Sequence, residues 1–230
     1  IPMGLGCVAD ALSRAGHRVR LLDLLVEDDP AGAVASAVAA GAPGLIGVSL
    51  RNIDDQNMAA PRFLLEGAKT VVSACRQHST APLVLGGAGY SIFPGACLAY
   101  LEADFGVAGE GEAAMSALAA ALEAGQDPSA IPGLFVRGQK APGSSERIRS
   151  LDRFPAPGPD WFPVSRYRAA DLWLPFQTRR GCPLRCSYCS TPVIEGRQIR
   201  RRSTEKAVHS LKRWADAGFS QVFFVDNTFN

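Results

Sequence analysis

The run Pro82-Leu-Val-Leu-Gly-Gly87 decides the fold of this chain, because it is a short apolar stretch that ends in two glycines. Such runs are typical of buried strands in a parallel sheet. Two further runs have the same character, at residues 44–50 (GLIGVSL) and 105–109 (FGVAG). Segments that fit helices alternate with these runs, at residues 31–40, 63–76, 95–101 and 112–124. The alternation predicts an α/β fold with a doubly wound, Rossmann-like parallel sheet, in which ligands bind beyond the carboxyl ends of the strands.

Composition excludes several classes of protein. The 230 residues are 47% hydrophobic and carry 24 Lys and Arg against 22 Asp and Glu, a net charge of +2. A chain of this kind can bury a core, and its charge gives no overall attraction to nucleic acid or to an anionic membrane. Residues 1–6 lack the basic and apolar regions of a signal peptide, and glycines and Pro43 interrupt the uncharged residues 31–50. We therefore expect a cytoplasmic protein with no membrane span.

The segments around this core suggest where domains divide. Residues 5–12 have helical spacing, residues 19–24 fit a strand, and residues 134–137 and 147–150 fit a hairpin around 142–145. Four prolines in residues 154–163 are typical of a semi-rigid linker. We predict a first domain over residues 1–138, a hairpin and Pro-rich linker over 139–170, and a second domain over 171–230.

The second domain has the pattern of a βαβ unit. Residues 174–178 fit a strand, residues 203–218 a helix that begins at Ser203, and residues 221–226 a second strand. One βαβ unit cannot bury its own sheet, and an α/β barrel needs about 200 residues or more. We expect these residues to be the opening of a barrel that the sequence truncates.

Three of the six cysteines, Cys182, Cys186 and Cys189, lie within eight residues of one another. Three thiolates at this spacing can bind a [4Fe-4S] cluster and leave one iron open for a substrate or cofactor. A zinc knuckle is the alternative, but zinc needs a fourth ligand, and His209 lies twenty residues further on. The remaining cysteines, Cys7, Cys75 and Cys97, are scattered in apolar or helical contexts, where a thiol behaves as a small apolar side chain.

The cysteine loop resembles that of the radical S-adenosylmethionine (SAM) superfamily. The resemblance includes Cys-x3-Cys-x2-Cys after a first strand, the aromatic Tyr188 before the last cysteine, and residues 179–181, 190–192, 200–203 and 225–230. It implies that SAM binds the open iron and is cleaved to a 5′-deoxyadenosyl radical, with Tyr188 beside the adenine. It also implies that Asp226 and Asn227 lie near the methionine moiety. A plain turn at the end of a strand is the alternative role for this pair.

The N-terminal region resembles the cobalamin-binding domain of the same proteins. The pieces that carry this resemblance, in order along the chain, are Gly4 in a helix start, Ser49-Leu50-Arg51, Gly86-Gly87, and Gly109-Glu110. Glycines at strand ends let the backbone approach a flat macrocycle, and Ser49 can bind corrin amides or phosphate. The same glycines could instead serve tight turns between strands and helices. The Asp-x-His-x-x-Gly motif that ligates cobalt in many cobalamin proteins is absent from the sequence.

Two other interpretations compete with these. Gly4-x-Gly6-x-x-Ala9, followed by Asp23, has the spacing of a dinucleotide fingerprint, which would make this an oxidoreductase domain. Only residues 1–3 stand where that motif needs a strand, and Pro2 suits a strand poorly. The arginines of residues 197–202 could bind phosphate, but no aromatic residues alternate with them to stack bases, so nucleic acid is not expected.

The resemblance implies a cobalamin-dependent radical SAM enzyme, most commonly a methyltransferase acting on an unactivated carbon or phosphorus. A cyclase or rearrangement enzyme and a non-catalytic cobalamin-binding fragment are the alternatives. The expected cofactors are a [4Fe-4S] cluster, SAM and cobalamin. The expected partners are an electron donor such as ferredoxin or flavodoxin and a small-molecule, peptide or lipid-like substrate that the sequence does not name.

Overall fold

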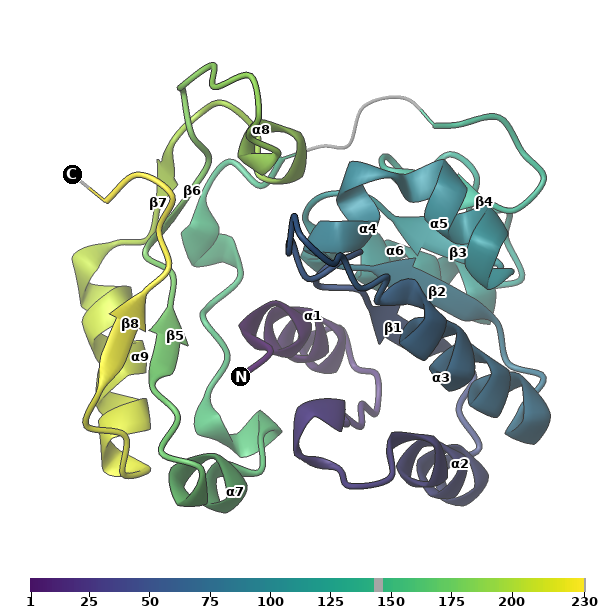
Figure 1. Cartoon of the computed structure of the whole chain (residues 1–230), viewed down its shortest axis with the longest axis horizontal. Coiled ribbons are helices and arrows are strands. Elements are labelled where there is room, and N and C mark those ends of the chain that lie inside the picture. Colours follow the sequence, from purple (N-terminus) through teal and green to yellow (C-terminus); the bar gives the residue numbers. More distant parts are fainter. Residues whose placement is uncertain (143–146, 230) are drawn as a thin grey trace. The chain divides into compact units, whose positions relative to one another are not determined.

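The computed structural model describes residues 1–142 and 147–229. The chain divides into two compact units, which are described separately (Figure 1). Unit 1 combines Ile1–Val26 with Arg147–Asn230, and unit 2 is Glu27–Glu146.

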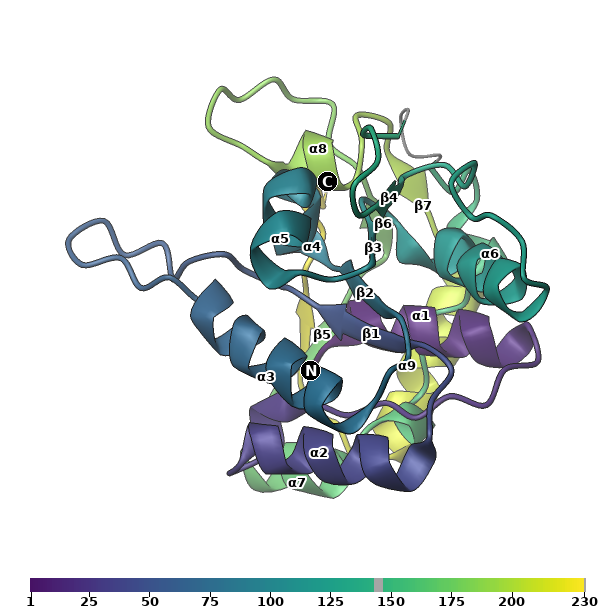
Figure 2. The same cartoon turned by 90° about the vertical axis from the view of Figure 1, so that its right-hand side faces the viewer.

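Unit 2 contains the predicted α/β sheet. Its elements are α2 (Pro30–Gly41), β1 (Ile46–Ser49), α3 (Leu65–His78), β2 (Leu83–Gly86), α4 (Ala88–Ile92), α5 (Pro94–Leu101), β3 (Phe105–Val107), α6 (Gly111–Glu123) and β4 (Leu134–Val136). The strand order is β1-β2-β3-β4, with β1, β2 and β3 parallel and β4 antiparallel to β3. Figure 2 shows α3 and α5 on one face of this sheet and α6 on the other. The mixed, mostly parallel sheet confirms the predicted α/β fold class.

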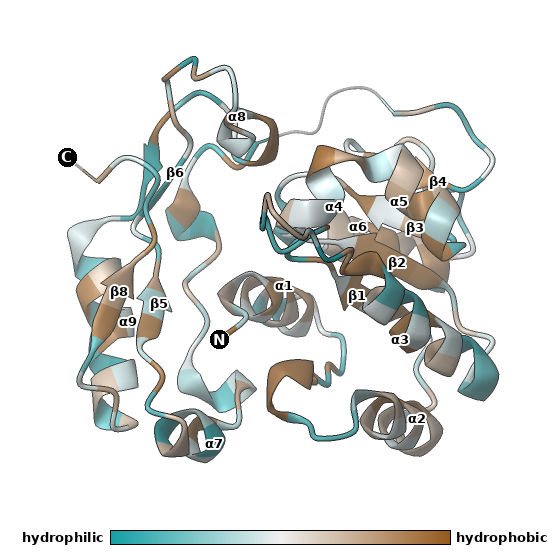
Figure 3. Cartoon of the chain, in the orientation of Figure 1, coloured by the Kyte–Doolittle hydropathy of each residue, from teal (hydrophilic) through white to brown (hydrophobic). Residues whose placement is uncertain are grey.

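The buried strand β2 explains why its sequence is apolar throughout. Leu83, Val84 and Leu85 are each at most 1% exposed, because neighbouring strands flank β2 and helices cover both sheet faces. Figure 3 shows β1 and β2 as apolar segments. Burial of each such side chain contributes roughly 1.5–3 kcal/mol. The strand-end loops of unit 2 therefore start from a rigid core.

Unit 1 contains the predicted βαβ unit. Its elements are α1 (Met3–Arg14), three short 3-10 helices (Leu24–Val26, Leu151–Arg153 and Pro159–Trp161), α7 (Val164–Ala169), β5 (Leu174–Phe176), β6 (Arg179–Arg180), α8 (Thr191–Ile194), β7 (Arg200–Arg201), α9 (Thr204–Asp216) and β8 (Val222–Phe224). Strands β5 and β8 pair in parallel, with Leu174 opposite Val222, and β6 pairs antiparallel with β7. Helix α9 begins at the predicted cap, where the Ser203 side chain accepts from the Lys206 amide at 3.4 Å. No closed barrel is seen in the described residues.

The Pro-rich segment is part of the core of unit 1. Ala156 and Phe162 are buried, and the Trp214 indole donates to the carbonyl of Pro157 at 3.0 Å. Phe162 stacks at a tilt against Trp214, with ring centroids 5.6 Å apart. The segment predicted as a linker is therefore packed. The predicted domain boundaries themselves stay a prediction.

Two predicted elements are wrong. Residues 19–24 form no strand; Asp23 instead accepts a hydrogen bond from Tyr167, and both side chains are buried. The hairpin is also absent, because the Leu134–Val136 strand pairs with β3 and residues 147–150 are not in a strand. Residues 143–146, most of the predicted turn, lie outside the described residues.

Candidate functional site

The cysteine loop begins at a fixed point beyond the carboxyl end of β5. Gly181 has a φ of +93°, and a Cβ on it would lie 2.1 Å from the carbonyl oxygen of Gln198. Only glycine fits this close approach. The amide of the next residue, Cys182, donates to the carbonyl of Gly196 at 3.1 Å. The first cysteine is thereby anchored to the segment that follows the loop.

The three loop cysteines differ in exposure. All three are free thiols; Cys182 is buried, whereas Cys186 and Cys189 are exposed. The amide of Cys189 donates to the carbonyl of Cys186 at 3.3 Å, and Tyr188 is 91% exposed. Hydrogen bonds from Thr191 lower the pKa of the Cys189 thiol. In the described parts of the chain, no three His, Cys, Asp or Glu side chains are gathered as a metal site.

These three cysteines fit an iron–sulfur cluster by their donor chemistry. None of the three thiols is in a disulfide, and two of them are exposed to solvent. Residues 181–190 are in neither helix nor strand. Clusters of this kind are bound by cysteine thiolates, and one loop supplies three of them here. The roles of the cysteines, like that of Tyr188, stay predictions.

The residues after β8 hold the beginning of the cysteine loop. Asp226 accepts from the amides of Thr178 and Arg179 at 2.8 and 3.0 Å and from the Thr178 hydroxyl at 2.5 Å. The Thr228 hydroxyl lies 3.4 Å from the Sγ of Cys182. Asp226 therefore has a structural role at the strand end, which favours the turn interpretation for this residue. A role of Asp226 and Asn227 toward SAM stays a prediction.

The arginines around the loop bind backbone carbonyls. Arg197 donates to Leu184, Arg200 to Ile148 and Glu195, and Arg202 to Leu151 and Phe154. Figure 3 shows the β6–β7 pair, which carries four arginines, as hydrophilic. These bonds give Arg197, Arg200 and Arg202 a structural role around the loop.

In unit 2, the predicted cobalamin loops after β1 and β2 contact each other. The amide of Leu50 donates to the carbonyl of Gly86 at 2.8 Å, and the amide of Gly89 donates to the carbonyl of Leu50 at 2.9 Å. Gly87 has a φ of +97°, and a Cβ there would lie 2.4 Å from the Leu50 oxygen and 2.9 Å from the Ser49 hydroxyl. Gly87 therefore serves the tight approach of two loops. At Gly86, by contrast, a Cβ would meet only the Val107 carbonyl at 3.8 Å, so this strand end is open.

Ser91, which the sequence analysis missed, links the loops after β2 and β3. Its buried hydroxyl donates to the carbonyl of Gly87 at 2.8 Å and accepts from the amide of Gly109 at 2.9 Å. The structure thus gathers Ser49, Leu50, Gly86, Gly87 and Gly109 at one edge of the sheet. Among these residues, the exposed hydroxyl of Ser49 and the open backbone at Gly86 fit the amide and phosphate groups of cobalamin.

Three other predicted cobalamin residues lie around or outside this edge. Arg51 follows Leu50 and is exposed, and Glu110 immediately precedes α6. Gly4 belongs to α1 of unit 1, and a Cβ on it would meet nothing within 4 Å. The roles of all three stay predictions.

The dinucleotide interpretation does not hold. Residues 1 and 2 are not in a strand, and a Cβ on Gly6 would lie 2.4 Å from the Phe162 ring. Gly6 is thus used for packing within unit 1, and Asp23 is used by Tyr167. Neither residue is available to a dinucleotide.

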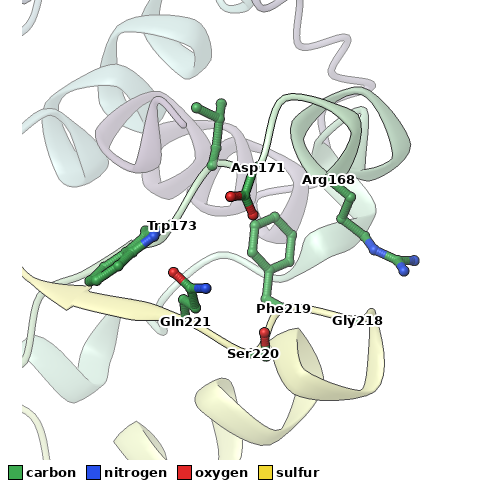
Figure 4. A pocket seen from close by; sticks show the side chains of 8 residues that line it. Arg168, Asp171, Trp173, Gly218, Phe219, Ser220 and Gln221 are labelled. Atoms are coloured by element: carbon green, nitrogen blue, oxygen red, sulfur yellow. The ribbon is translucent and has the colours of Figure 1, made fainter.

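Two surface cavities lie at the opposite, amino ends of the strands. A pocket of about 130 Å³ is lined by residues that precede β5 and β8. Figure 4 shows Asp171, Trp173 and Gln221 among them. A second pocket, of about 460 Å³ in unit 2, is lined by Lys69, Arg76 and residues around Asp104 before β3. Neither contains a predicted site residue, and ligands of α/β sheets bind at the other edge.

The helices give one further result. None of those in residues 1–142 and 147–229 is long and apolar enough to cross a membrane.

Comparison with known proteins identifies the family. The B12 binding domain model matches residues 1–119. Tryptophan 2-C-methyltransferase of Streptomyces laurentii is 28% identical, over 100% of this chain and 47% of that protein. Hopanoid C-3 methylase of Methylococcus capsulatus is 28% identical, over 98% of this chain and 42% of that protein.

Solved structures show a similarity to the same class of methyltransferases. Two structures of the radical SAM methyltransferase TsrM from Kitasatospora setae superpose with a TM-score of 0.86 over 100% of this chain, at 26% and 27% identity. One of them contains tryptophan and a SAM analogue, and the other contains cobalamin and a [4Fe-4S] cluster. The chain covers 45% and 46% of those structures.

The chain belongs to the B12-binding domain family. More particularly, it is homologous to cobalamin-dependent radical SAM methyltransferases. It spans about half the length of the relatives it matches.

Proposed function

We propose that this chain forms the cobalamin- and cluster-binding part of a radical SAM methyltransferase. The observation that carries the proposal is the cysteine loop. Its three free cysteines lie on one loop beyond β5; the backbone of Cys182 is hydrogen bonded to Gly196, and Cys186 and Cys189 are exposed. The match of residues 1–119 to a B12-binding domain on the same chain supports the combination.

In this proposal Cys182, Cys186 and Cys189 bind a [4Fe-4S] cluster, which supplies the electron that cleaves SAM. Gly181 and the Cys182 amide fix the start of the loop, so that Cys186 and Cys189 close around the cluster. Tyr188, exposed between them, offers a ring for adenine. An electron donor such as ferredoxin or flavodoxin reaches the loop from solvent.

Cobalamin lies, in the same proposal, over the loops that follow β1, β2 and β3, where it supplies a methyl carrier. Ser49 and the amides around Gly86 bind its polar groups. Ser91 holds the loops at Gly87 and Gly109 together. The reaction is methyl transfer, in a cytoplasmic protein, to a substrate with an unactivated carbon or phosphorus. The methylases that this chain resembles act on different molecules, tryptophan and hopanoids by their names, so the substrate is left open.

Anaerobic reconstitution of the chain with iron and sulfide tests the cluster ligands. We expect about four irons per chain in the wild type, loss of most of them in Cys186→Ala, and no change in Cys75→Ala, whose thiol is buried in unit 2. Full iron and sulfide content in Cys186→Ala would contradict the assignment. Cobalamin uptake, followed by absorbance in the same samples, should be equal in all three proteins.

A further inference from the structure

Glu195 receives hydrogen bonds from three separate segments around the cysteine loop. Its Oε1 accepts from the Gln177 amide nitrogen at 2.8 Å. Its Oε2 accepts from the backbone amide of Gly181 at 2.9 Å and from the Asn227 amide nitrogen at 2.9 Å. One carboxylate therefore joins the end of β5, the start of the cysteine loop and the segment after β8.

All three partners are N–H donors, which explains why a carboxylate stands here. An ionised carboxylate offers only acceptors, so it satisfies three donors at once. A glutamine of the same shape would turn an NH2 group toward one of them. Hydrogen bonds to a charged acceptor are shorter and stronger than those between neutral groups.

The backbone around Glu195 is itself held in place. Its amide donates to the Thr191 carbonyl at 2.8 Å, and its carbonyl accepts from Arg200. Arg147 donates to the carbonyls of Val193 and Ile194, at 2.7 and 2.6 Å. The carboxylate thus reaches its partners from a rigid base.

The contacts continue from Glu195 to the last cysteine of the loop. Asn227 donates to Glu195 with its nitrogen and accepts from the Thr191 hydroxyl with its oxygen, at 3.2 Å. Thr191 in turn hydrogen bonds to Cys189. Gly181, at the other end of the chain of contacts, directly precedes Cys182. Both ends of the cysteine loop are therefore connected through the side chains of Glu195, Asn227 and Thr191.

We propose that Glu195 is a positioning residue that fixes both ends of the cysteine loop and the orientation of the Asn227 amide. This inference rests on the proposed function. It assigns a role to a residue that lies outside the three-cysteine motif. Groups that hold metal ligands in place typically change metal affinity or activity about 10–100-fold when they are replaced.

The test compares Glu195→Gln with two controls in the reconstituted chain. Glu205→Gln makes the same change at an exposed carboxylate in the first turn of α9. Tyr167→Phe removes the buried hydrogen bond to Asp23 and destabilises unit 1 without touching the loop. The readouts are iron content, the midpoint potential of the cluster, and the change in its electron paramagnetic resonance (EPR) spectrum on addition of SAM.

We expect Glu195→Gln to shift the midpoint potential and to weaken SAM binding, measured by the EPR change, about tenfold. Both controls should match the wild type in potential and in SAM response. The inference is overturned if Glu195→Gln matches the wild type, or if Tyr167→Phe reproduces its changes at an equal loss of melting temperature. If Glu195→Gln does not fold, Gln177→Met, which removes one donor, replaces it with the same expected directions and the same overturning results.

The wild type separates this inference from the function on which it rests. If the wild-type chain takes up no cluster, the proposed function fails. If it takes up a cluster that responds to SAM, and Glu195→Gln behaves identically, only the role of Glu195 fails.

Discussion

The hydroxyl of Ser91 accepts a hydrogen bond from the backbone amide of Gly109 at 2.9 Å. The same hydroxyl donates to the carbonyl of Gly87 at 2.8 Å. Because Gly87 follows β2 and Gly109 follows β3, one buried side chain connects two of the three candidate cobalamin loops.

Ser91→Ala should therefore loosen both loops. The change leaves the partly buried Gly109 amide without this acceptor and should lower the stability of unit 2 by about 1 kcal/mol, measured by denaturant unfolding. It should also weaken cobalamin binding. Ser116→Ala is the matched control, since that hydroxyl donates within α6, to the carbonyl of Glu112. We expect this variant to bind cobalamin as the wild type does. Equal cobalamin affinity in Ser91→Ala would remove Ser91 from the site.

The two glycines after β2 should respond differently to alanine. Gly87→Ala forces a side chain into φ +97°, 2.4 Å from the Leu50 oxygen, which should cost about 1–3 kcal/mol in stability before any ligand is added. Gly86→Ala fits the cofactor-free fold, because its Cβ would meet only the Val107 oxygen at 3.8 Å.

Gly86→Ala therefore isolates the space that cobalamin needs. Its melting temperature should equal that of the wild type, while its cobalamin affinity falls. An unchanged affinity in an equally stable Gly86→Ala protein would show that the macrocycle does not approach this strand end.

Tyr90 has a buried hydroxyl for which no hydrogen-bond partner is found among the residues described. Its hydroxyl occupies the space left by Gly106, where a Cβ would collide with it. An unsatisfied buried hydroxyl costs about 1–3 kcal/mol, so Tyr90→Phe should preserve or raise the stability of unit 2. A loss of cobalamin affinity in this variant would instead make the hydroxyl a ligand of the cofactor.

The raised pKa of Tyr90 also predicts that the stability of unit 2 depends on pH. Burial raises the pKa of Tyr90 well above its usual value near 10. The unfolded chain loses this proton above about pH 10 while the folded chain keeps it, so stability falls as the pH rises past 10. Tyr90→Phe should flatten this decline in unfolding experiments between pH 9 and pH 11. A slope equal to that of the wild type would mean that Tyr90 titrates normally.

Asp226 separates a structural role from a cofactor role. Asp226→Ala removes three hydrogen bonds to Thr178 and Arg179 and should lower the melting temperature of the cofactor-free chain. Asp216→Ala, at an exposed position at the end of α9 in the same unit, is the control. An unchanged melting temperature together with weaker SAM binding would reverse our interpretation of this residue.

The sequence predicts the elements whose signals are local. Apolar runs locate β1, β2 and β3, and Ser203 locates the start of α9. The three cysteines lie within eight residues, and each glycine loop is a short motif, so the sequence alone reveals these motifs. The matches to known proteins confirm the family that these motifs resemble.

What the sequence does not predict depends on partners far apart in the chain. Residues 19–23 have the composition of a strand, but Asp23 meets Tyr167, 144 residues away. Ser91 and Glu195 bind backbone amides that only the folded loops bring to them. Neither residue type at those positions carries a signal of its own. An acidic residue between Ile194 and Gly196 reads as ordinary surface until Gly181 is placed beside it.

The most direct test of the account is the EPR spectrum of the anaerobically reconstituted, reduced chain, recorded with and without SAM. The account predicts the signal of a reduced [4Fe-4S] cluster that changes shape when SAM is added, and that is lost when Cys186 is replaced by alanine. A chain that takes up no cluster, or a cluster whose signal is unaffected by SAM, would contradict it.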